Sequence, residues 1–328
     1  MRKAVLIFLS VILLCSCREK EYDVCVYGGT SSGVIAAYTA AKSGLKVVLV
    51  EPTEHIGGMT TGGLGYTDIG NKQVVKGLAK QFYRKIGKHY GALEQWIFEP
   101  SVADSIMRDY LSEKNISVLT GHRILSSSML NERISSIIVE QSSSPHKTRE
   151  VFARYFIDCS YEGDLMARSG VSYTVGREAN ESYGETLNGV ELMTRHQFPD
   201  GIDPYREPGK PESGLLWGIS DATLKQNGTG DCMVQAYNYR ICLTDRRDNM
   251  IPIGRPADYD STRYELLLRL MAAYPEKLSL NDWFIWSRMP GGKTDINNRG
   301  GFSTDMIGMN HLYPEASYEL RDSIIGAH

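Results

Sequence analysis

The sequence of 328 residues lacks several patterns that mark common classes of protein. It has no C-x-x-C pair, so the redox-active disulfide of dithiol enzymes has no counterpart here. It has no H-E-x-x-H or other metal-ligand spacing, so we predict no metal site. No run of five or more basic residues occurs and the formal net charge is −3, which argues against a nucleic-acid partner. With 42% apolar residues the chain can still build a sizeable core, and its length suggests about two domains.

The N-terminal apolar run is too short to cross a membrane as a helix, which needs about 20 residues. This run, Ala4–Leu14, follows Arg2-Lys3 and ends in Leu14-Cys15-Ser16-Cys17. The order is typical of an export signal, and its end resembles a bacterial lipobox. We therefore predict a lipoprotein signal peptide over residues 1–17, lipidation of Cys17, and an address at the cell envelope with a lipid anchor as the only membrane contact. A plain signal peptide cut elsewhere is the alternative.

Four further cysteines fit either a reducing or an oxidising compartment. Cys25 and Cys159 fall at strands and are predicted to be buried small hydrophobes. Cys232 and Cys242 could form a disulfide in an oxidising compartment or remain free, since spacing alone does not establish the geometry.

The stretch of residues 23–65 carries the strongest functional signal. It consists, in order, of the apolar run Val24–Tyr27, the turn Gly28-Gly29-Thr30-Ser31-Ser32-Gly33, the Ala-rich segment Val34–Lys42, and the apolar run Lys46–Val50 ending in Glu51. The order strand, tight turn, helix, strand and acid predicts a dinucleotide-binding βαβ unit. The acid lies 23 positions after the first turn glycine, close to the spacing of about 20 residues that this fingerprint has.

Each residue type in this unit has a chemical reason. Gly28 permits the sharp turn, and Gly33 lets the helix pack close while its N-terminus faces a pyrophosphate. Glu51 can accept hydrogen bonds from both ribose hydroxyls, which disfavours NADP because of its 2′-phosphate. Thr30 departs from the G-x-G-x-x-G pattern, since it puts a Cβ and a hydroxyl where backbone normally approaches the pyrophosphate.

The motifs YGGTSSG (27–33) and EPTEHIGGM (51–59) resemble the FAD-dependent oxidoreductases built like glutathione reductase, in particular a bacterial family whose turn reads GGT-x-x-G. The later D-C-S-Y-E-G-D (158–164) is similar to the D-A-T-x-x-G-D of that family. The resemblance implies FAD as cofactor and a loop, residues 55–65, that passes under the pyrophosphate toward the flavin ring. The residues that it implies for cofactor binding are Gly28, Gly29, Thr30, Ser31, Ser32, Gly33, Glu51, Gly57, Gly58, Met59, Ile124, Asp158, Cys159 and Ser160. Asp164 could serve the cofactor or simply cap a helix.

The resemblance implies an α/β fold. We expect a Rossmann-like, three-layer FAD-binding domain with an antiparallel β-meander over residues 22–176, and a mixed α+β substrate domain over 177–328. Periodicity predicts helices over 72–90 and 102–114, the latter capped by Ser101, and a strand over 116–119. It also predicts antiparallel strands over 133–141 and 149–154 around a turn at 142–145, and a separate return strand over 155–158. In the second domain we expect mixed strands and a helix, including residues 233–243 and 264–274.

The second domain carries a polar, Gly-rich stretch over residues 297–305, which is typical of a site for a hydroxyl-rich ligand and equally of a loop with satisfied local hydrogen bonds. The candidate acid/base imidazoles are His55, His196 and His311, and His55 is favoured because it begins the loop aimed at the flavin. No catalytic residue is assigned.

Together these features predict an oxidoreductase that removes hydride from a small polar substrate, such as a sugar-like alcohol, and passes the electrons to an acceptor that the residues do not identify. The first alternative is a surface lipoprotein that binds glycan without turnover, with Trp217, Trp283 and Trp286 as stacking platforms. The second is an inactive flavin binder. The sequence ends inside a predicted helix that begins near Ser317, so we expect a truncated gene product, a fragment or one half of a split protein, without the C-terminal segment that closes the flavin site in the resembled family.

Overall fold

The computed structural model describes residues 22–328, so the predicted signal peptide and Cys17 lie outside the described residues. The described chain forms two compact units. The first unit contains the chain up to Gly62 together with Asn71–Gln95 and Pro100–Ser172. The second contains Gly63–Gly70, Trp96–Glu99 and Tyr173–His328. Over residues 22–328, no helix is both long and apolar enough to span a membrane.

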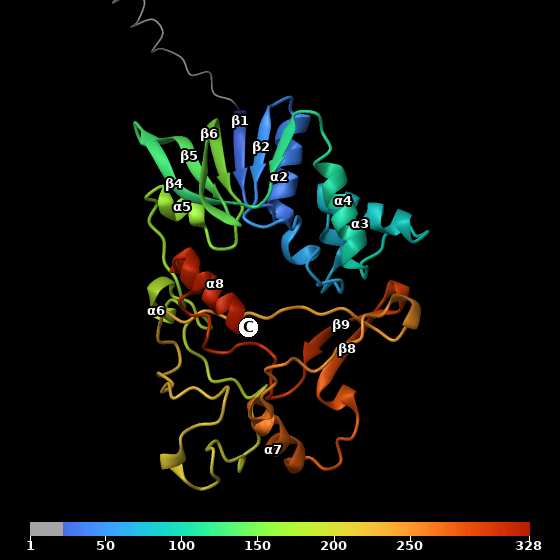
Figure 1. The fold of residues 1–328 in the computed structure, drawn as a ribbon, viewed down its shortest axis with the longest axis vertical. Helices are drawn as coiled ribbons and strands as arrows, with labels where there is room; N and C mark the ends of the chain where they lie inside the picture. Colours follow the sequence, from blue (N-terminus) through green and yellow to red (C-terminus); the bar gives the residue numbers. More distant parts are fainter. Residues whose placement is uncertain (1–21) are drawn as a thin grey trace, which may run out of the picture. The chain divides into compact units, whose positions relative to one another are not determined.

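The first unit is an α/β structure built on one six-stranded sheet (Figure 1). Its strands are β1 (Tyr22–Tyr27), β2 (Val47–Val50), β3 (Ile116–Leu119), β4 (His122–Leu130), β5 (Arg133–Gln141) and β6 (Ser144–Asp158). Its helices are α2 (Ser31–Lys42), α3 (Gly77–His89), α4 (Pro100–Tyr110) and α5 (Asp164–Arg168), with 3-10 turns at Gly58–Thr60 and Lys72–Val74.

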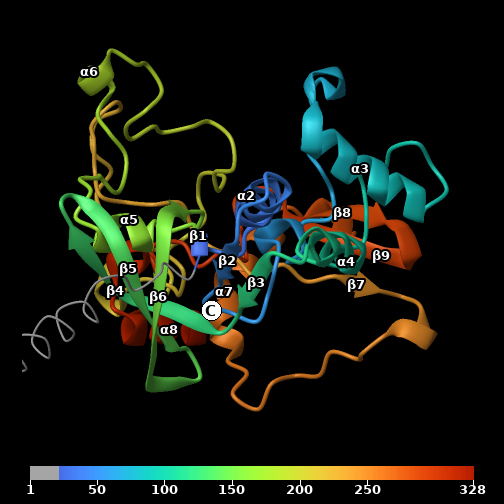
Figure 2. The same cartoon turned by 90° about the horizontal axis from the view of Figure 1, so that it is seen from above.

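The sheet order is β3-β2-β1-β6-β5-β4. Strands β3, β2, β1 and the end of β6 run parallel, whereas β4, β5 and the start of β6 form an antiparallel meander. Seen from above, α2 lies against the parallel strands and the meander projects to one side (Figure 2). This is the Rossmann-like arrangement with a meander that the sequence predicts, and the fold class is confirmed.

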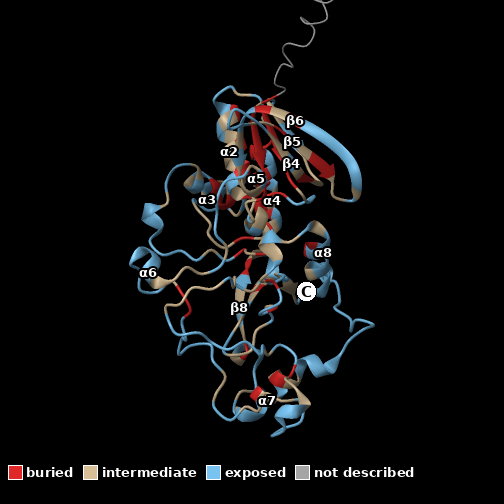
Figure 3. Ribbon diagram, turned by 90° about the vertical axis from the view of Figure 1, so that its left-hand side faces the viewer, coloured by how far each residue is buried: buried red, intermediate tan, exposed pale blue. Residues whose placement is uncertain are grey.

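The core of the first unit lies within its six-stranded sheet, where buried residues gather in β1, β2 and the meander, and Figure 3 shows the buried segments of this unit in red. Every residue of β2 is buried, as expected for a strand that is covered on both faces in a parallel sheet. Cys25 in β1 is fully buried and burial raises the pKa of its thiol to about 12, so it behaves as the small hydrophobe that was predicted. Tyr27 is also buried, and its hydroxyl accepts the backbone N–H of Ile124 at 3.1 Å.

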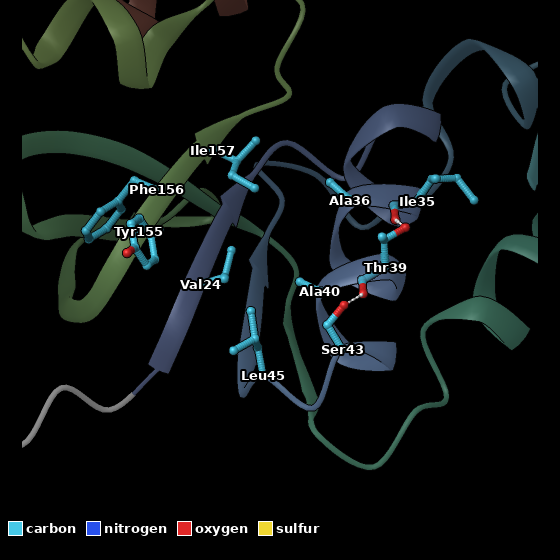
Figure 4. Close-up of a pocket in the computed structure, with 10 residues that line it drawn as sticks. All are labelled: Val24, Ile35, Ala36, Thr39, Ala40, Ser43, Leu45, Tyr155, Phe156 and Ile157. Carbon is cyan, nitrogen blue, oxygen red and sulfur yellow. Dashed lines mark hydrogen bonds between the residues drawn. The ribbon is translucent and has the colours of Figure 1, made fainter.

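A shallow apolar groove of about 700 Å³ runs along the flank of α2 (Figure 4). One wall is the helix face from Ile35 to Ser43, and the other is formed by β1 and the end of β6. On β6, Tyr155 and Ile157 project into solvent with 64% and 37% of their surfaces exposed. No charged side chain lines this groove.

The second unit has less regular structure. Its strands are β7 (Leu243–Thr244), β8 (Phe284–Met289) and β9 (Lys293–Asn298), which form an antiparallel sheet in the order β7-β9-β8. Its helices are α6 (Asn180–Tyr183), α7 (Glu265–Ala273) and α8 (Tyr318–Ala327). Ser317 caps α8 by accepting the N–H of Leu320.

Several predicted boundaries were wrong. The strands expected over 149–154 and 155–158 are one strand, β6, which first pairs with β5 and then with β1. Strand β4 was not predicted. Helix α4 begins at Pro100, so Ser101 lies inside the helix instead of capping it, in keeping with the preference of proline for the first helical position. Residues 233–243 were expected among the mixed strands and helix of the second domain, but of these residues only Leu243 lies in such an element, β7. The described cysteines are all free thiols, including Cys232 and Cys242.

Candidate dinucleotide-binding site

The turn between β1 and α2 is closed so tightly that only glycine fits at two positions. Gly28 has a left-handed φ of 99°, and a Cβ there would lie 2.5 Å from the backbone N of Ser160 and 2.6 Å from the carbonyl carbon of Cys159. A Cβ on Gly33 would collide with the carbonyl oxygen of Gly28. The two glycines thus bring the end of β6 and the first turn of α2 against the same short loop.

Thr30, which departs from the glycine pattern, links this loop to α2 and to the end of β6 through hydrogen bonds of its hydroxyl. Its backbone is extended, and its hydroxyl oxygen accepts the N–H of Gly33 at 3.3 Å as the N-cap of α2. The same hydroxyl donates to the carbonyl oxygen of Cys159 at 2.8 Å. The side chain is buried, with 6% of its surface exposed, so it is part of the frame of the turn.

Glu51 stands at the end of β2 beside the turn. Its Oε2 accepts the backbone N–H of Gly29 at 2.6 Å, and its Oε1 accepts the N–H and the hydroxyl of Thr53 at 2.8 and 2.7 Å. Each carboxylate oxygen has two acceptor positions. Oε2 therefore keeps a lone pair for a further donor, such as a ribose hydroxyl.

The loop after Glu51 folds back onto the N-terminus of α2. Gly57 pairs with Thr30 as a parallel bridge, and its N–H donates to the carbonyl of Gly29 at 2.7 Å. The Ser31 hydroxyl donates to the carbonyl oxygen of Gly57 at 2.8 Å. The N–H of Met59 donates to the hydroxyl of Tyr161 at 2.8 Å. This loop is thereby fixed against both α2 and the segment that follows β6.

The side chains of Asp158 and Ser160 cap the short helix α5. Asp158 accepts the N–H of Met166 at 2.9 Å and the hydroxyl of Ser160 at 2.6 Å, and Ser160 Oγ accepts the N–H of Gly163 at 3.1 Å. Asp164 is the first residue of α5 and is buried, whereas the N-cap position is Gly163, so the two roles considered for Asp164 stay predictions. The positive end of α5 is thus occupied by the protein's own groups.

The N-terminus of α2 differs from that of α5 because its first turn carries no acidic residue. The first amides of a helix have no partner within the helix, and together with the helix dipole they attract an anion. Of the two helix ends at this site, that of α2 suits a pyrophosphate.

The structure therefore gathers the predicted residues of the turn, Glu51, Gly57–Met59 and Asp158–Ser160 into one region of the first unit. Ile124 is placed differently from the rest, since it is fully buried in the core. It is nevertheless near, because its neighbour His122 donates its N–H to the backbone oxygen of Glu51 at 3.0 Å.

Two contributors were missed from sequence. Thr53 holds Glu51, and Tyr161 holds the loop at Met59. Tyr161 lies at a variable position of the D-C-S-Y-E-G-D motif, so the motif gave it no role. The signal for Thr53 was its place two residues after the acid, where its hydroxyl and N–H can both reach the carboxylate.

His55 is engaged in its own loop. Its Nε2 lies 2.8 Å from the hydroxyl oxygen of Thr61 and 3.2 Å from the carbonyl oxygen of Gly58. Because Thr61 donates its proton to the carbonyl of Ile56 at 2.5 Å, Nε2 of His55 is the donor toward both oxygens. The ring therefore supports the loop through Nε2.

The other two candidate imidazoles lie in the second unit. His311 accepts the N–H of Val234 at 3.2 Å, and His196 is exposed with a left-handed φ of 59°.

The polar stretch over residues 297–305 hydrogen-bonds within itself. Asn298 accepts the N–H of Thr304 at 3.0 Å and donates to the hydroxyl of Ser303 at 3.0 Å. The stretch therefore has the geometry of a loop whose polar groups satisfy one another.

The three tryptophans do not form a common exposed platform, because Trp283 is 8% exposed while Trp217 is 42% exposed. Within the described residues no group of three or more His, Cys, Asp or Glu side chains could hold a metal ion.

The glycine turn, the acid at the end of the second strand and the six-stranded sheet define a dinucleotide-binding α/β protein. The family described as FAD dependent oxidoreductase matches residues 23–327, and the chain belongs to this family. Its cofactor is FAD, as predicted.

Relatives of the chain have several activities. A thiamine thiazole synthase of Pyrococcus horikoshii is 38% identical over 217 residues, which cover 60% of this chain and 83% of that protein. A 3-oxosteroid 1-dehydrogenase of Mycolicibacterium smegmatis is 44% identical over 57 residues, which cover 17% of this chain and 10% of that protein. The crystal structure of THI4 from Thermovibrio ammonificans has a TM-score of 0.36 at 17% identity, covering 58% of this chain and 80% of that one. The family is confirmed, whereas a specific likeness to glutathione reductase is not supported by these relatives.

The residues at the turn fit FAD on structural grounds. Gly28 and Gly33 keep their own positions in the turn free of side chains, the first turn of α2 carries no acidic residue, and Glu51 keeps a lone pair for a ribose hydroxyl. The apolar groove along α2 does not fit, because a pyrophosphate needs hydrogen-bond donors or positive charge. No charged side chain lines that groove, and its hydroxyls, Thr39 and Ser43, donate to carbonyl oxygens of α2 itself. This apolar groove is therefore not the dinucleotide site.

Proposed function

We propose that the chain binds FAD with the pyrophosphate at residues 28–33 and the adenosine ribose at Glu51, and that it takes a hydride from a small polar substrate. The observation that carries this proposal is the bond from Gly29 N–H to Glu51, which sets the acid beside the N-terminus of α2. Bound FAD supplies the hydride acceptor. The protein's part is to hold the cofactor and orient the substrate.

In this proposal each element of the site has its own role, which its contacts support. The Gly28–Gly33 turn offers backbone amides to the pyrophosphate, and Thr30 keeps the turn attached to β6. The loop from His55 to Thr61 is held by its own hydrogen bonds and by Tyr161, so it offers a fixed surface to the rest of the cofactor. In this proposal Asp158 and Ser160 act as positioning residues, since their side chains are used on α5.

The test is flavin binding followed by a substrate screen. Protein refolded with FAD should show flavin absorbance, and NAD should not displace it. Anaerobic addition of polar alcohols, including sugars, and of amines should then bleach the flavin for at least one compound. Retention of NAD in preference to FAD would contradict the assignment of the site. Tight FAD with no bleaching by any compound, but with affinity for glycans, would instead favour the glycan-binding alternative.

A second candidate is thiazole synthesis, favoured by the 38% identity to a protein of that name over most of its length. We infer this activity only from the relative, since no residue of this chain is assigned to that chemistry. An assay for thiazole formation with the FAD-loaded protein separates the two candidates, because hydride removal from a simple alcohol or amine yields no thiazole.

A further inference from the structure

A small, partly open cavity lies in the second unit, apart from any residue assigned to FAD. Its volume is about 220 Å³. It lies where the end of α7 and the turn after it meet the start of β8, the residues that follow β9 and a segment near residue 197. The residues that matter here are Tyr274, Lys277, Asp282, Trp283, Arg299 and Gly301.

Two cations, Lys277 and Arg299, line this cavity without an ion-pair partner among the described residues. Within residues 22–328 no carboxylate oxygen lies within 4.0 Å of the Lys277 ammonium or the Arg299 guanidinium. Lys277 Nζ instead lies 3.7 Å from the centre of the Tyr274 ring and 5.4 Å from that of Trp283. The carboxylate in the lining, Asp282, accepts the N–H of Ser279 at 2.9 Å as part of a capping box. The lining therefore has an excess of one positive charge.

The frame around these cations is built from backbone contacts. The N–H of Arg299 donates to the carbonyl of Trp283 at 3.1 Å, which extends the β8–β9 pairing by one step beyond Phe284 and Asn298. A Cβ on Gly301 would lie 3.0 Å from the backbone of Gln197, so the opposite wall is in close contact with this turn. Trp283 is buried and forms an apolar surface beneath the Lys277 ammonium.

We propose that this cavity binds a small organic monoanion, with its carboxylate at Lys277 and Arg299 and its apolar part against Trp283 and Tyr274. A guanidinium presents paired donors that match a carboxylate, and a cation over aromatic rings leaves the remaining ammonium hydrogens for a ligand. The volume falls below the range of about 300–1,000 Å³ that drug-sized ligands occupy. A dinucleotide or an oligosaccharide is therefore too large, whereas a metabolite of the size of benzoate fits.

The experiment is calorimetric titration of the FAD-loaded full chain with benzoate and with benzamide, its neutral analogue. We expect saturable binding of benzoate and affinity for benzamide lower by about tenfold or more. Arg299→Gln and Lys277→Gln should each weaken benzoate binding by about tenfold, and Arg299→Lys should give an intermediate loss because it keeps the charge without the paired donors. This readout needs no turnover, so it is independent of the proposed oxidoreductase activity.

Arg247→Gln is the matched control, since Arg247 is an exposed arginine of the same unit outside the cavity lining. It should leave the benzoate affinity unchanged. All variants should keep the thermal unfolding midpoint of the parent, because the substituted side chains lie at the surface or the cavity edge. Absence of saturable benzoate binding, equal affinity for benzamide, or equal losses in Arg299→Gln and Arg247→Gln would overturn the proposal.

Discussion

The carboxylate of Glu51 accepts the backbone N–H of Gly29 at 2.6 Å, so the acid that ends the second strand supports the turn that ends the first. One side chain thus serves both the shape of the glycine turn and the proposed recognition of ribose. The dual role makes this residue the most sensitive point of the site.

Glu51→Gln should weaken FAD binding by about 10–100-fold, corresponding to about 1.4–2.8 kcal/mol. The amide can accept through one group only, so either Gly29 or Thr53 faces an N–H instead of an oxygen. Titration of the refolded apoprotein with FAD, followed by flavin fluorescence, measures the change. Glu132→Gln, in an exposed turn of the same unit, is the control and should bind FAD like the parent.

Gly28→Ala should destabilise the protein far more than Gly44→Ala. Both glycines have left-handed backbone, with φ of 99° and 84°, so both substitutions carry a strain of about 1 kcal/mol. Only Gly28 faces backbone that cannot move away, whereas nothing lies within 4 Å of a Cβ on Gly44. Unfolding by urea should show an additional loss of about 2 kcal/mol or more for Gly28→Ala. Equal losses would mean that the end of β6 yields easily.

The ion pair of Arg177 and Asp231 should contribute fully to the free energy of unfolding only above about pH 4. The hydrogen bond from Arg177 is the largest cause that lowers the pKa of Asp231 from its ordinary 3.8. A carboxyl whose pKa is lower in the folded state stabilises the fold above pH 4 and loses this contribution as the pH falls through the folded pKa.

Asp231→Asn should therefore lower the unfolding free energy at pH 7 by about 1 kcal/mol, since Arg177 is 36% exposed and solvent screens the pair. The difference from the parent should shrink as the pH falls below about 4. Urea unfolding at a series of pH values measures it, with Asp221→Asn as an exposed control. A difference that grows in acid would contradict a stabilising role for the ionised carboxylate.

Alkylation should distinguish the buried Cys25 from the exposed Cys232. Burial raises the pKa of Cys25 to about 12, whereas Cys232 is exposed. Because the thiolate is the reactive form, iodoacetamide at pH 8 should modify Cys232 in the native protein and spare Cys25 until the protein is unfolded. Peptide mass spectrometry identifies the sites. Native labelling of both at one rate would show that β1 opens readily.

The parallel part of the sheet could be predicted because its signals are local. The run Val47–Val50 is apolar throughout, and Gly28 and Gly33 mark the turn between β1 and α2. The element boundaries that were predicted wrongly depend on tertiary partners. Strand β4 contains Ser126, Ser127 and Ser128, which have little strand tendency of their own, and it forms because β5 pairs with it.

In the candidate site, too, the features with local signals could be predicted and those that depend on tertiary contacts could not. The turn, Glu51 and the loop at Gly57 follow from motif chemistry, whereas Tyr161 acts through a contact across more than a hundred residues. Residues 149–158 changed from a polar to an apolar pattern, which suggested two strands. The change instead marks the point where one strand leaves β5 and joins β1.

That change of partner divides the assembly of β6 into a fast and a slow step. Its first part closes a hairpin with β5, a contact between near neighbours in sequence. Its second part must find β1, from which α2, α3, α4 and the meander separate it. Non-local pairing carries the larger loop-closure cost and sets folding rates. The meander should therefore protect its amides from hydrogen exchange early in refolding, and the amide of Cys159, bonded to Tyr27, should become protected only when the glycine turn takes its final form.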